Sequence, residues 1–171
     1  MNKKILLILY TLIFVFFGQT IYAVETNQSA PDCALSGIND NQAYAINQYK
    51  GKVIYVDFWA SWCSPCAQSF PFMNNLSSTL KDRGLQIVGV NLDDNKDDAL
   101  AFLTKYQAKF LVTIDKKQQC ARDFDVQGMP ASYLIDRKGV VRHIHLGFRE
   151  DEAKDLQLLV EQLLAEPAMM P

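Results

Sequence analysis

The sequence has no excess of positive charge, no internal repeat and no low-complexity tract. Its 171 residues carry 17 lysines and arginines against 19 aspartates and glutamates, which gives a formal net charge of -2. A surface for nucleic acid or for an anionic membrane needs a basic excess, so neither partner is indicated. The length suits one domain with a substantial core.

Cysteine is scarce, and its spacing argues against zinc. The chain has four cysteines, of which only Cys63 and Cys66 stand close together. A structural zinc site would need a second ligand pair of similar spacing, which is absent.

Histidine is scarcer still, with two in the chain. His143 and His145 are two residues apart in an expected strand, so they lie on the same face. A metal site would need a third ligand, and none is evident. We therefore interpret both histidines as solvent-facing. The acidic cluster that begins at Asp93 and Asp94 is typical of helix capping in a solvated loop, not of a calcium loop. We therefore expect no metal.

The N-terminus has the pattern of a secretory signal over residues 1–23. Lys3 and Lys4 precede an apolar run over residues 5–17, and Ala23 is a plausible last residue before cleavage. As a helix this run spans about 20 Å, which is short for a hydrocarbon core of about 30 Å. Cleavage and an uncleaved anchor both remain open, and either one places the domain outside the cytoplasm. Disulfides are the default state of cysteines there.

The rest of the chain divides into a polar lead-in segment over residues 24–42, a domain over 43–165 and a flexible tail over 166–171. Hydrophobic periodicity and turn residues predict alternating strands and helices, followed by a hairpin and a last helix. This order is typical of an α/β fold with a central mixed sheet covered by helices on both faces. The expected strands are 44–46, 53–59, 86–92, 111–114, 131–135 and 140–146; the expected helices are 63–83, with a kink at Pro71, 96–106, 118–124 and 151–165.

Cys63 and Cys66 form a Cys-x-x-Cys motif between a buried strand and a helix. A helix N-terminus gathers unpaired N–H groups and partial positive charge, which favours a thiolate, the form that attacks disulfides. We expect Cys63 to be the exposed nucleophile and Cys66 to resolve the mixed disulfide. A structural staple is the alternative, but so short a loop removes little chain entropy.

Asp57 is the candidate proton acceptor for Cys66, directly or through a water. Alternation along the strand places it on one face with Val53, Tyr55 and Trp59, so we expect burial and a raised pKa. An exposed strand residue is the alternative.

Trp62 and Pro65 are candidates for substrate contact beside the cysteines. Trp62 has packing as its alternative role. Pro65 removes one N–H from the loop, which weakly favours a reductant over a strong oxidant. Its alternative role is simply to start the helix.

Cys33 and Cys120 leave three readings open: a second disulfide, two buried thiols, or reactive cysteines that extend a redox relay. An even number of cysteines in an exported chain motivates the structural disulfide, but the pairing cannot be deduced from sequence.

Several stretches together resemble the thioredoxin superfamily, in its periplasmic TlpA/ResA-like branch. Residues 57–66 are similar to the active-site strand and loop of thioredoxins, and Gly128-Met129-Pro130 is similar to their cis-proline loop. The branch is indicated by the signal, by the extra strand–helix block at 86–106 and by the stretches 30–32 and 133–139. One departure is Ser69, where members often carry Glu, so any tuning of the thiols by that Glu is in doubt.

The resemblance implies a thioredoxin-like fold and a thiol–disulfide oxidoreductase. It implies that Pro130 is cis, and that Met129 and Pro130 offer backbone groups and a soft side chain to an incoming peptide. Implied clients are proteins bearing disulfides, of the kind matured into cytochromes c or copper sites, with a membrane electron donor for re-reduction and no organic cofactor.

Two alternatives remain at this stage. The first is the opposite direction, a disulfide donor like the strongly oxidising Dsb proteins, because direction depends on a reduction potential that sequence gives poorly. The second is a copper-binding assembly factor on the same fold. Such factors usually space their cysteines by three residues and add a distant histidine, which this chain does not match.

Overall fold

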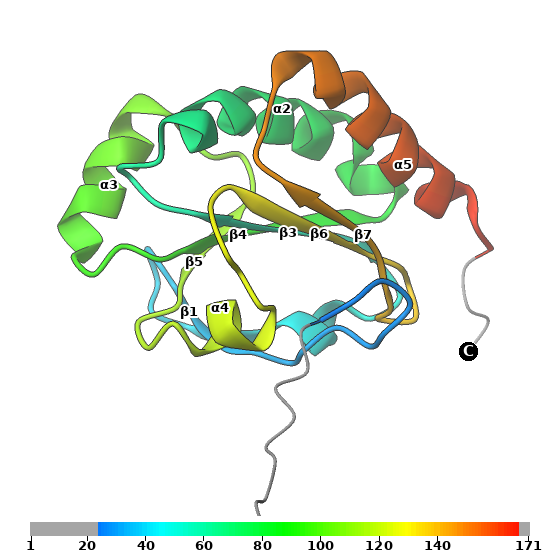
Figure 1. The fold of residues 1–171 in the computed structure, drawn as a ribbon, viewed down its shortest axis with the longest axis horizontal. Helices are drawn as coiled ribbons and strands as arrows, with labels where there is room; N and C mark the ends of the chain where they lie inside the picture. Colours follow the sequence, from blue (N-terminus) through cyan, green and yellow to red (C-terminus); the bar gives the residue numbers. More distant parts are fainter. Residues whose placement is uncertain (1–23, 168–171) are drawn as a thin grey trace, which may run out of the picture.

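The computed structural model describes residues 24–167, and Figure 1 shows a sheet with helices on both of its faces. The expected signal over 1–23 and the end of the expected tail lie outside these residues. Within them, no helix is both long and apolar enough to cross a membrane. The sheet has seven strands in the order β2-β1-β5-β4-β3-β6-β7. The strands are β1 Ala34–Gly37, β2 Ala43–Ala45, β3 Val53–Trp59, β4 Leu85–Asn91, β5 Leu111–Ile114, β6 Ala131–Ile135 and β7 Val141–Leu146.

The helices divide between the two faces of this sheet (Figure 1). The first face packs against α2, α3 and α5 in a cluster that contains Trp59, Phe70 and Phe102. The second face packs against α4 and the N-terminal segment, around Phe58 and Phe124. The helices are α2 Ser64–Leu80, α3 Lys96–Lys105, α4 Gln119–Asp123 and α5 Ala153–Ala165, with short 3-10 turns at Ile46–Tyr49, Lys81–Arg83 and Glu150–Glu152.

The central strand β3 is buried along its whole length. It runs parallel to β4 and antiparallel to β6, which places Asp57 directly opposite Gly89 on one side and Ser132 on the other. Because side chains alternate between the two faces of a strand, Tyr55 and Trp59 enter the first cluster, while Phe58 enters the second. The loop that carries Cys63 therefore follows a strand that is buried along its whole length.

Helix α2 begins one residue after Cys63, which is its N-cap, and it continues past Pro71 to Leu80. Pro71 therefore lies inside the helix and does not end it, and the kink expected there stays a prediction. The chain then leaves through Gly84, whose φ of 100° lies in the left-handed region that favours glycine.

Strand β1 lies inside the segment that the sequence indicated as a polar lead-in. It pairs with β2 and β5, both antiparallel, and buries Leu35. Further upstream, backbone bonds join Asn27 and Gln28 to Val141 at the start of β7. A four-residue strand that includes a serine and a glycine has too weak a pattern to be found by periodicity.

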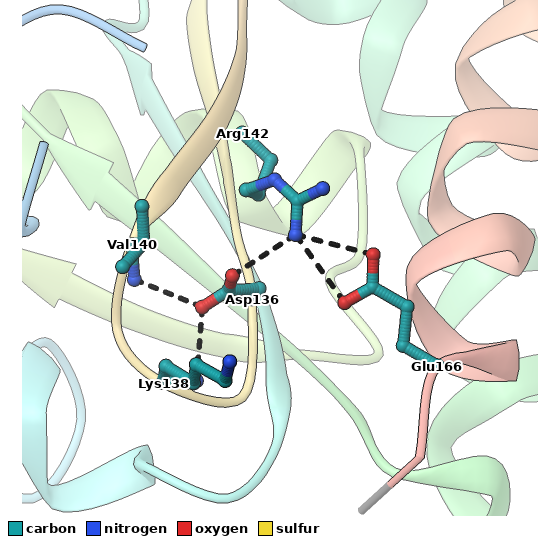
Figure 2. A network of polar contacts seen from close by, with 5 residues as sticks. All are labelled: Asp136, Lys138, Val140, Arg142 and Glu166. Atoms are coloured by element: carbon teal, nitrogen blue, oxygen red, sulfur yellow. Dashed lines mark hydrogen bonds and ion pairs between the residues drawn. The ribbon is translucent and has the colours of Figure 1, made fainter. Parts of the chain in front are cut away.

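The hairpin between β6 and β7 anchors the end of α5 (Figure 2). Asp136 accepts hydrogen bonds from the backbone N–H groups of Lys138 and Val140 at 2.9 and 3.0 Å. Arg142 joins Asp136 to Glu166, with N–O distances of 3.1 Å to each. The first residue of the expected tail is therefore held by an ion pair.

Candidate redox site

The structure joins Cys63 and Cys66 in a disulfide at the N-terminus of α2. The Cys63 Sγ accepts a hydrogen bond from the backbone N–H of Cys66 at 3.2 Å. Cys63 keeps 5% of its surface exposed and Cys66 keeps none. The order of exposure is as expected, but Cys63 is much more covered than an exposed nucleophile. The N–H groups and dipole of the helix lie where they stabilise a thiolate at Cys63.

Ser69, which stands where the resemblance often has Glu, is buried one turn after Cys66. Its hydroxyl donates to the carbonyl of Cys66 at 3.0 Å. The position therefore contributes a neutral contact to the backbone of the helix and no carboxylate near the cysteines.

Trp62 is 72% exposed, an unusual state for so large an apolar side chain. Beside it lies an open groove of about 380 Å³ between the cysteine loop and α3, lined by Trp62, Cys63, Ala67, Phe102 and Lys105 among others. Pro65 is exposed within the first turn of α2. The groove beside Cys63 thus combines apolar side chains with polar and charged ones, among them Ser64 and Asp98.

The Met129–Pro130 peptide bond is cis, as the resemblance implied. Pro130 is buried, and its carbonyl accepts a hydrogen bond from the N–H of Gly147 at 2.8 Å. Met129 is half-buried and packs against the cluster that holds both cysteines. Its own N–H and C=O have no hydrogen-bond partner among residues 24–167, so they are free to pair with another chain.

Asp57 is fully buried, on the face of β3 that sequence alternation predicted. The hydroxyl of Ser132 donates to its Oδ1 at 2.6 Å, and the hydroxyl of Tyr55 donates to Ser132 Oγ at 3.0 Å. Burial raises the pKa of Asp57 from its ordinary value of 3.8 to about 7, and the bond from Ser132 opposes that rise. Burial likewise raises the pKa of Tyr55. A carboxyl with a pKa near neutrality is suited to exchange protons.

Asp93 has a role that the sequence analysis missed. It is buried, and it accepts hydrogen bonds from the backbone N–H of Ser61 at 3.0 Å, from the Ser61 hydroxyl at 2.9 Å and from the Asn91 amide at 2.7 Å. Asn95, not Asp93, caps α3. No local pattern pairs Asp93 with Ser61, because the two residues follow different strands and meet only once β3 and β4 run side by side in parallel.

Cys33 and Cys120 are joined in a second disulfide across a sequence separation of 87 residues. Both are buried in the cluster on the face of the sheet opposite Cys63 and Cys66. Of the three open readings, the structure contains the paired one. The sheet separates the two disulfides, which argues against direct exchange between them.

His143 and His145 are half-buried rather than solvent-facing, with ring centroids 6.3 Å apart. Burial is the main cause of a lowered pKa at His143, and the neighbouring His145 adds to it. His145 Nε2 lies 3.3 Å from a carboxylate oxygen of Glu152. Over residues 24–167 no group of three or more His, Cys, Asp or Glu is placed to hold a metal ion.

The site and the related proteins agree on the class of enzyme. The chain is a thiol–disulfide oxidoreductase with a thioredoxin-like fold. More narrowly, residues 25–159 match the Redoxin family, and the chain belongs to that family.

Three relatives illustrate the likeness. The thiol-disulfide oxidoreductase ResA of Geobacillus kaustophilus (strain HTA426) is 31% identical over 164 residues, which cover 92% of this chain and 93% of the relative. The thioredoxin-like protein YneN of Bacillus subtilis (strain 168) is 35% identical over 127 residues, 72% of this chain and 73% of YneN. A crystal structure from Chlorobium tepidum, described as a thiol:disulfide interchange protein DsbE, is 42% identical with a TM-score of 0.80 and covers 84% of this chain and 100% of its own.

Proposed function

We propose that this enzyme reduces disulfides in client proteins outside the cytoplasm, with Cys63 and Cys66 as its redox pair. The observation that carries the proposal is the disulfide itself, with Cys63 at the N-terminus of α2 beside the exposed Trp62. A purely structural disulfide here would add little to the free energy of unfolding, because the loop that it closes is so short.

The reaction starts from the reduced pair. The Cys63 thiolate attacks one sulfur of the client disulfide, a Cys63–client bond forms, and the first client sulfur leaves and takes up a proton. The Cys66 sulfur then attacks Cys63, which breaks the mixed disulfide and releases the second client thiol. Two electrons pass to the client, and the enzyme is left with the disulfide that the structure contains.

Asp57 takes the proton that Cys66 loses in the second step. The support is its burial on β3 and its pKa of about 7, which let the carboxyl accept a proton near neutral pH. Tyr55 and Trp59, which flank Asp57 on the same face of β3, pack in the cluster that contains Cys66. The thiol and the carboxyl thus belong to one region of the core.

The client docks across Trp62, Pro65 and Met129, beside the buried Pro130. Trp62 offers apolar area at little conformational cost, and the unpaired backbone groups of Met129 suit an extended client segment that adds to them as a strand would. Met129 supplies a soft side chain that accepts varied sequences.

The family likeness supports the proposed direction, clients and compartment. ResA, a relative by sequence, is named a thiol-disulfide oxidoreductase. By the resemblance, the clients are proteins with cysteine pairs that await a haem or copper, a membrane protein returns the electrons, and the domain works in the periplasm. Cys33–Cys120 serves as a structural staple that joins the N-terminal segment to α4.

The test is to trap a client. In a Cys66→Ser variant the resolving sulfur is absent, so we expect a mixed disulfide through Cys63 to accumulate and to separate on a non-reducing gel. Cys63→Ser is the matched control and should trap nothing. Equal trapping by both variants, or trapping by Cys63→Ser alone, would overturn the assignment of the nucleophile.

A further inference from the structure

The proton acceptor belongs to a hydrogen-bonded row of three buried side chains. Asp57 and Ser132 face each other across β3 and β6, and Ser132 is almost fully buried. Ser132 uses its hydroxyl twice, because it donates to Asp57 Oδ1 at 2.6 Å and accepts from the Tyr55 hydroxyl at 3.0 Å. The Tyr55 contact fixes the direction in which the Ser132 proton points, since a hydroxyl has one proton to donate.

The two carboxyl oxygens of Asp57 differ in their hydrogen bonds. Oδ1 is held by Ser132, whereas Oδ2 is buried and has no hydrogen-bond partner among the described residues. A buried oxygen without a partner costs free energy, and in native proteins such atoms occur at strained or catalytic groups or beside an ordered water or ion. A proton from Cys66 is a partner that Oδ2 would gain during the reaction.

We propose that Ser132, held in place by Tyr55, is a positioning residue that occupies Oδ1 of Asp57 and so makes Oδ2 the atom that accepts the proton from Cys66. The inference rests on the proposed function, because it concerns the step in which Cys66 resolves the mixed disulfide. In that step the S–H bond of Cys66 breaks and an O–H bond forms at Oδ2, directly or through one water. The Cys66 sulfur bonds to Cys63, and the client sulfur leaves with the electron pair of the broken bond.

Few other groups titrate around Asp57. On its own strand the titratable neighbour is Tyr55, and the facing positions of β4 and β6 are Gly89 and Ser132. Helix α2 contributes Cys63 and Cys66, which titrate when reduced, and α5 contributes apolar side chains to the same cluster. No charged side chain is among the causes of the pKa of Asp57. A change at Ser132 should therefore act on the carboxyl without interference from another charge.

The first readout is the titration of Asp57 itself, followed by the ¹³C chemical shift of its carboxyl carbon in the oxidised protein. Ser132→Ala removes the donor that favours the ionised form, so we expect its midpoint to rise by about one pH unit. Tyr55→Phe should raise it by less, since Ser132 can still donate. Thr113→Val is the matched control, because it removes another buried hydroxyl, bonded to the Gly89 carbonyl and not to Asp57. It should leave the midpoint unchanged.

The second readout is the rate at which Cys66 resolves a preformed mixed disulfide between Cys63 and a model peptide, measured against pH. The acid limb of this profile should move with the carboxyl midpoint, so Ser132→Ala should be about tenfold slower than wild type near pH 6 and nearly equal above pH 9. Ser132→Thr keeps the hydroxyl and should restore both readouts, and Tyr55→Phe replaces Ser132→Ala should the latter not fold.

Two results would overturn the proposal. One is a midpoint in Ser132→Ala that equals that of wild type. The other is a midpoint that moves while the acid limb stays, which would mean that Asp57 does not accept the proton. Failure of the proposed function would look different, because Cys66→Ser would then trap no client whatever the titration of Asp57.

Discussion

The carboxylate of Asp93 holds Ser61, two residues before Cys63, by bonds from both its backbone N–H and its hydroxyl. Asn91, at the end of β4, donates to the same carboxylate at 2.7 Å. The loop that carries Trp62 and Cys63 is therefore fixed to the neighbouring strand and not only to α2. This matters for a nucleophile that is 5% exposed, because small movements of the loop decide whether a client sulfur can reach it.

Replacing Asp93 should loosen this loop. We expect Asp93→Ala to lower the free energy of unfolding by about 1–3 kcal/mol, because it leaves buried donors without partners. The rate of attack on a client disulfide should also fall. Denaturant unfolding and single-turnover kinetics measure the two effects. The control is Asp94→Ala, at the exposed position next to Asp93. If Asp94→Ala lowered stability and rate as much as Asp93→Ala, the hydrogen bonds of Asp93 would not be what holds the loop.

Trp62 should matter for protein clients and not for the chemistry of the thiols. We expect Trp62→Ala to raise KM for a protein disulfide by about tenfold, as the loss of one aromatic contact suggests. The rate with a small aromatic disulfide reagent should change little. Leu158→Ala removes another exposed apolar side chain, on α5, and should change neither. An equal loss with both substrates would show that Trp62 supports Cys63 itself.

The second disulfide should act on stability and not on activity. Replacing Cys33 and Cys120 by Ser frees a loop whose ends are 87 residues apart, which in the chain-entropy model costs about 4.6 kcal/mol of unfolding free energy. Reduction of a client by Cys63 and Cys66 should persist in the folded variant. The contrast is the Cys63→Ser, Cys66→Ser double variant, which should lose activity with a much smaller loss of stability. The reverse pattern would reassign the two disulfides.

The buried Asp57 should make the oxidised protein less stable as pH rises. Its folded pKa of about 7 exceeds its ordinary value of 3.8, so the folded state binds the proton more tightly. This contribution is complete below pH 3.8 and is lost as pH rises to about 7, by about 1.4 kcal/mol per pH unit. Asp57→Asn lacks it, so the stability of the variant relative to wild type should grow by about 4 kcal/mol between pH 4 and pH 8.

Denaturant unfolding at several pH values measures this difference. An Asp94→Asn variant, at an exposed position, supplies the baseline. A difference between Asp57→Asn and wild type that is independent of pH would mean that Asp57 titrates near its ordinary value in the folded protein.

Much of the fold was predictable from local patterns in the sequence. Strands β3, β5 and β6 begin and end where predicted, because each is a short apolar run between turn residues. Strand β1 was missed, since its four residues gain their stability from β2 and β5 and not from their own pattern. Periodicity reports burial along one element, and it says little about a strand defined by its neighbours.

The site was likewise predictable residue by residue, but not in the pairings between residues that lie far apart in the sequence. Alternation placed Asp57 inside, yet its partner Ser132 lies 75 residues further on, and only the register of β3 with β6 brings them together. The sequence does not reveal that Asp93 holds the cysteine loop, because its partner Ser61 follows a different strand. Pairings of this kind depend on topology, which the residues at either end do not encode locally.

The most direct test of the proposed function is the equilibrium reduction potential of the Cys63–Cys66 pair. It should be measured on the chain from Val24 onward, with differential alkylation of each cysteine peptide so that Cys33–Cys120 is read separately. We predict a value toward the about -270 mV of thioredoxin, as expected of a reductant that must be supplied with electrons. A value near the about -120 mV of DsbA would mean that the enzyme donates disulfides, and would contradict the proposed direction.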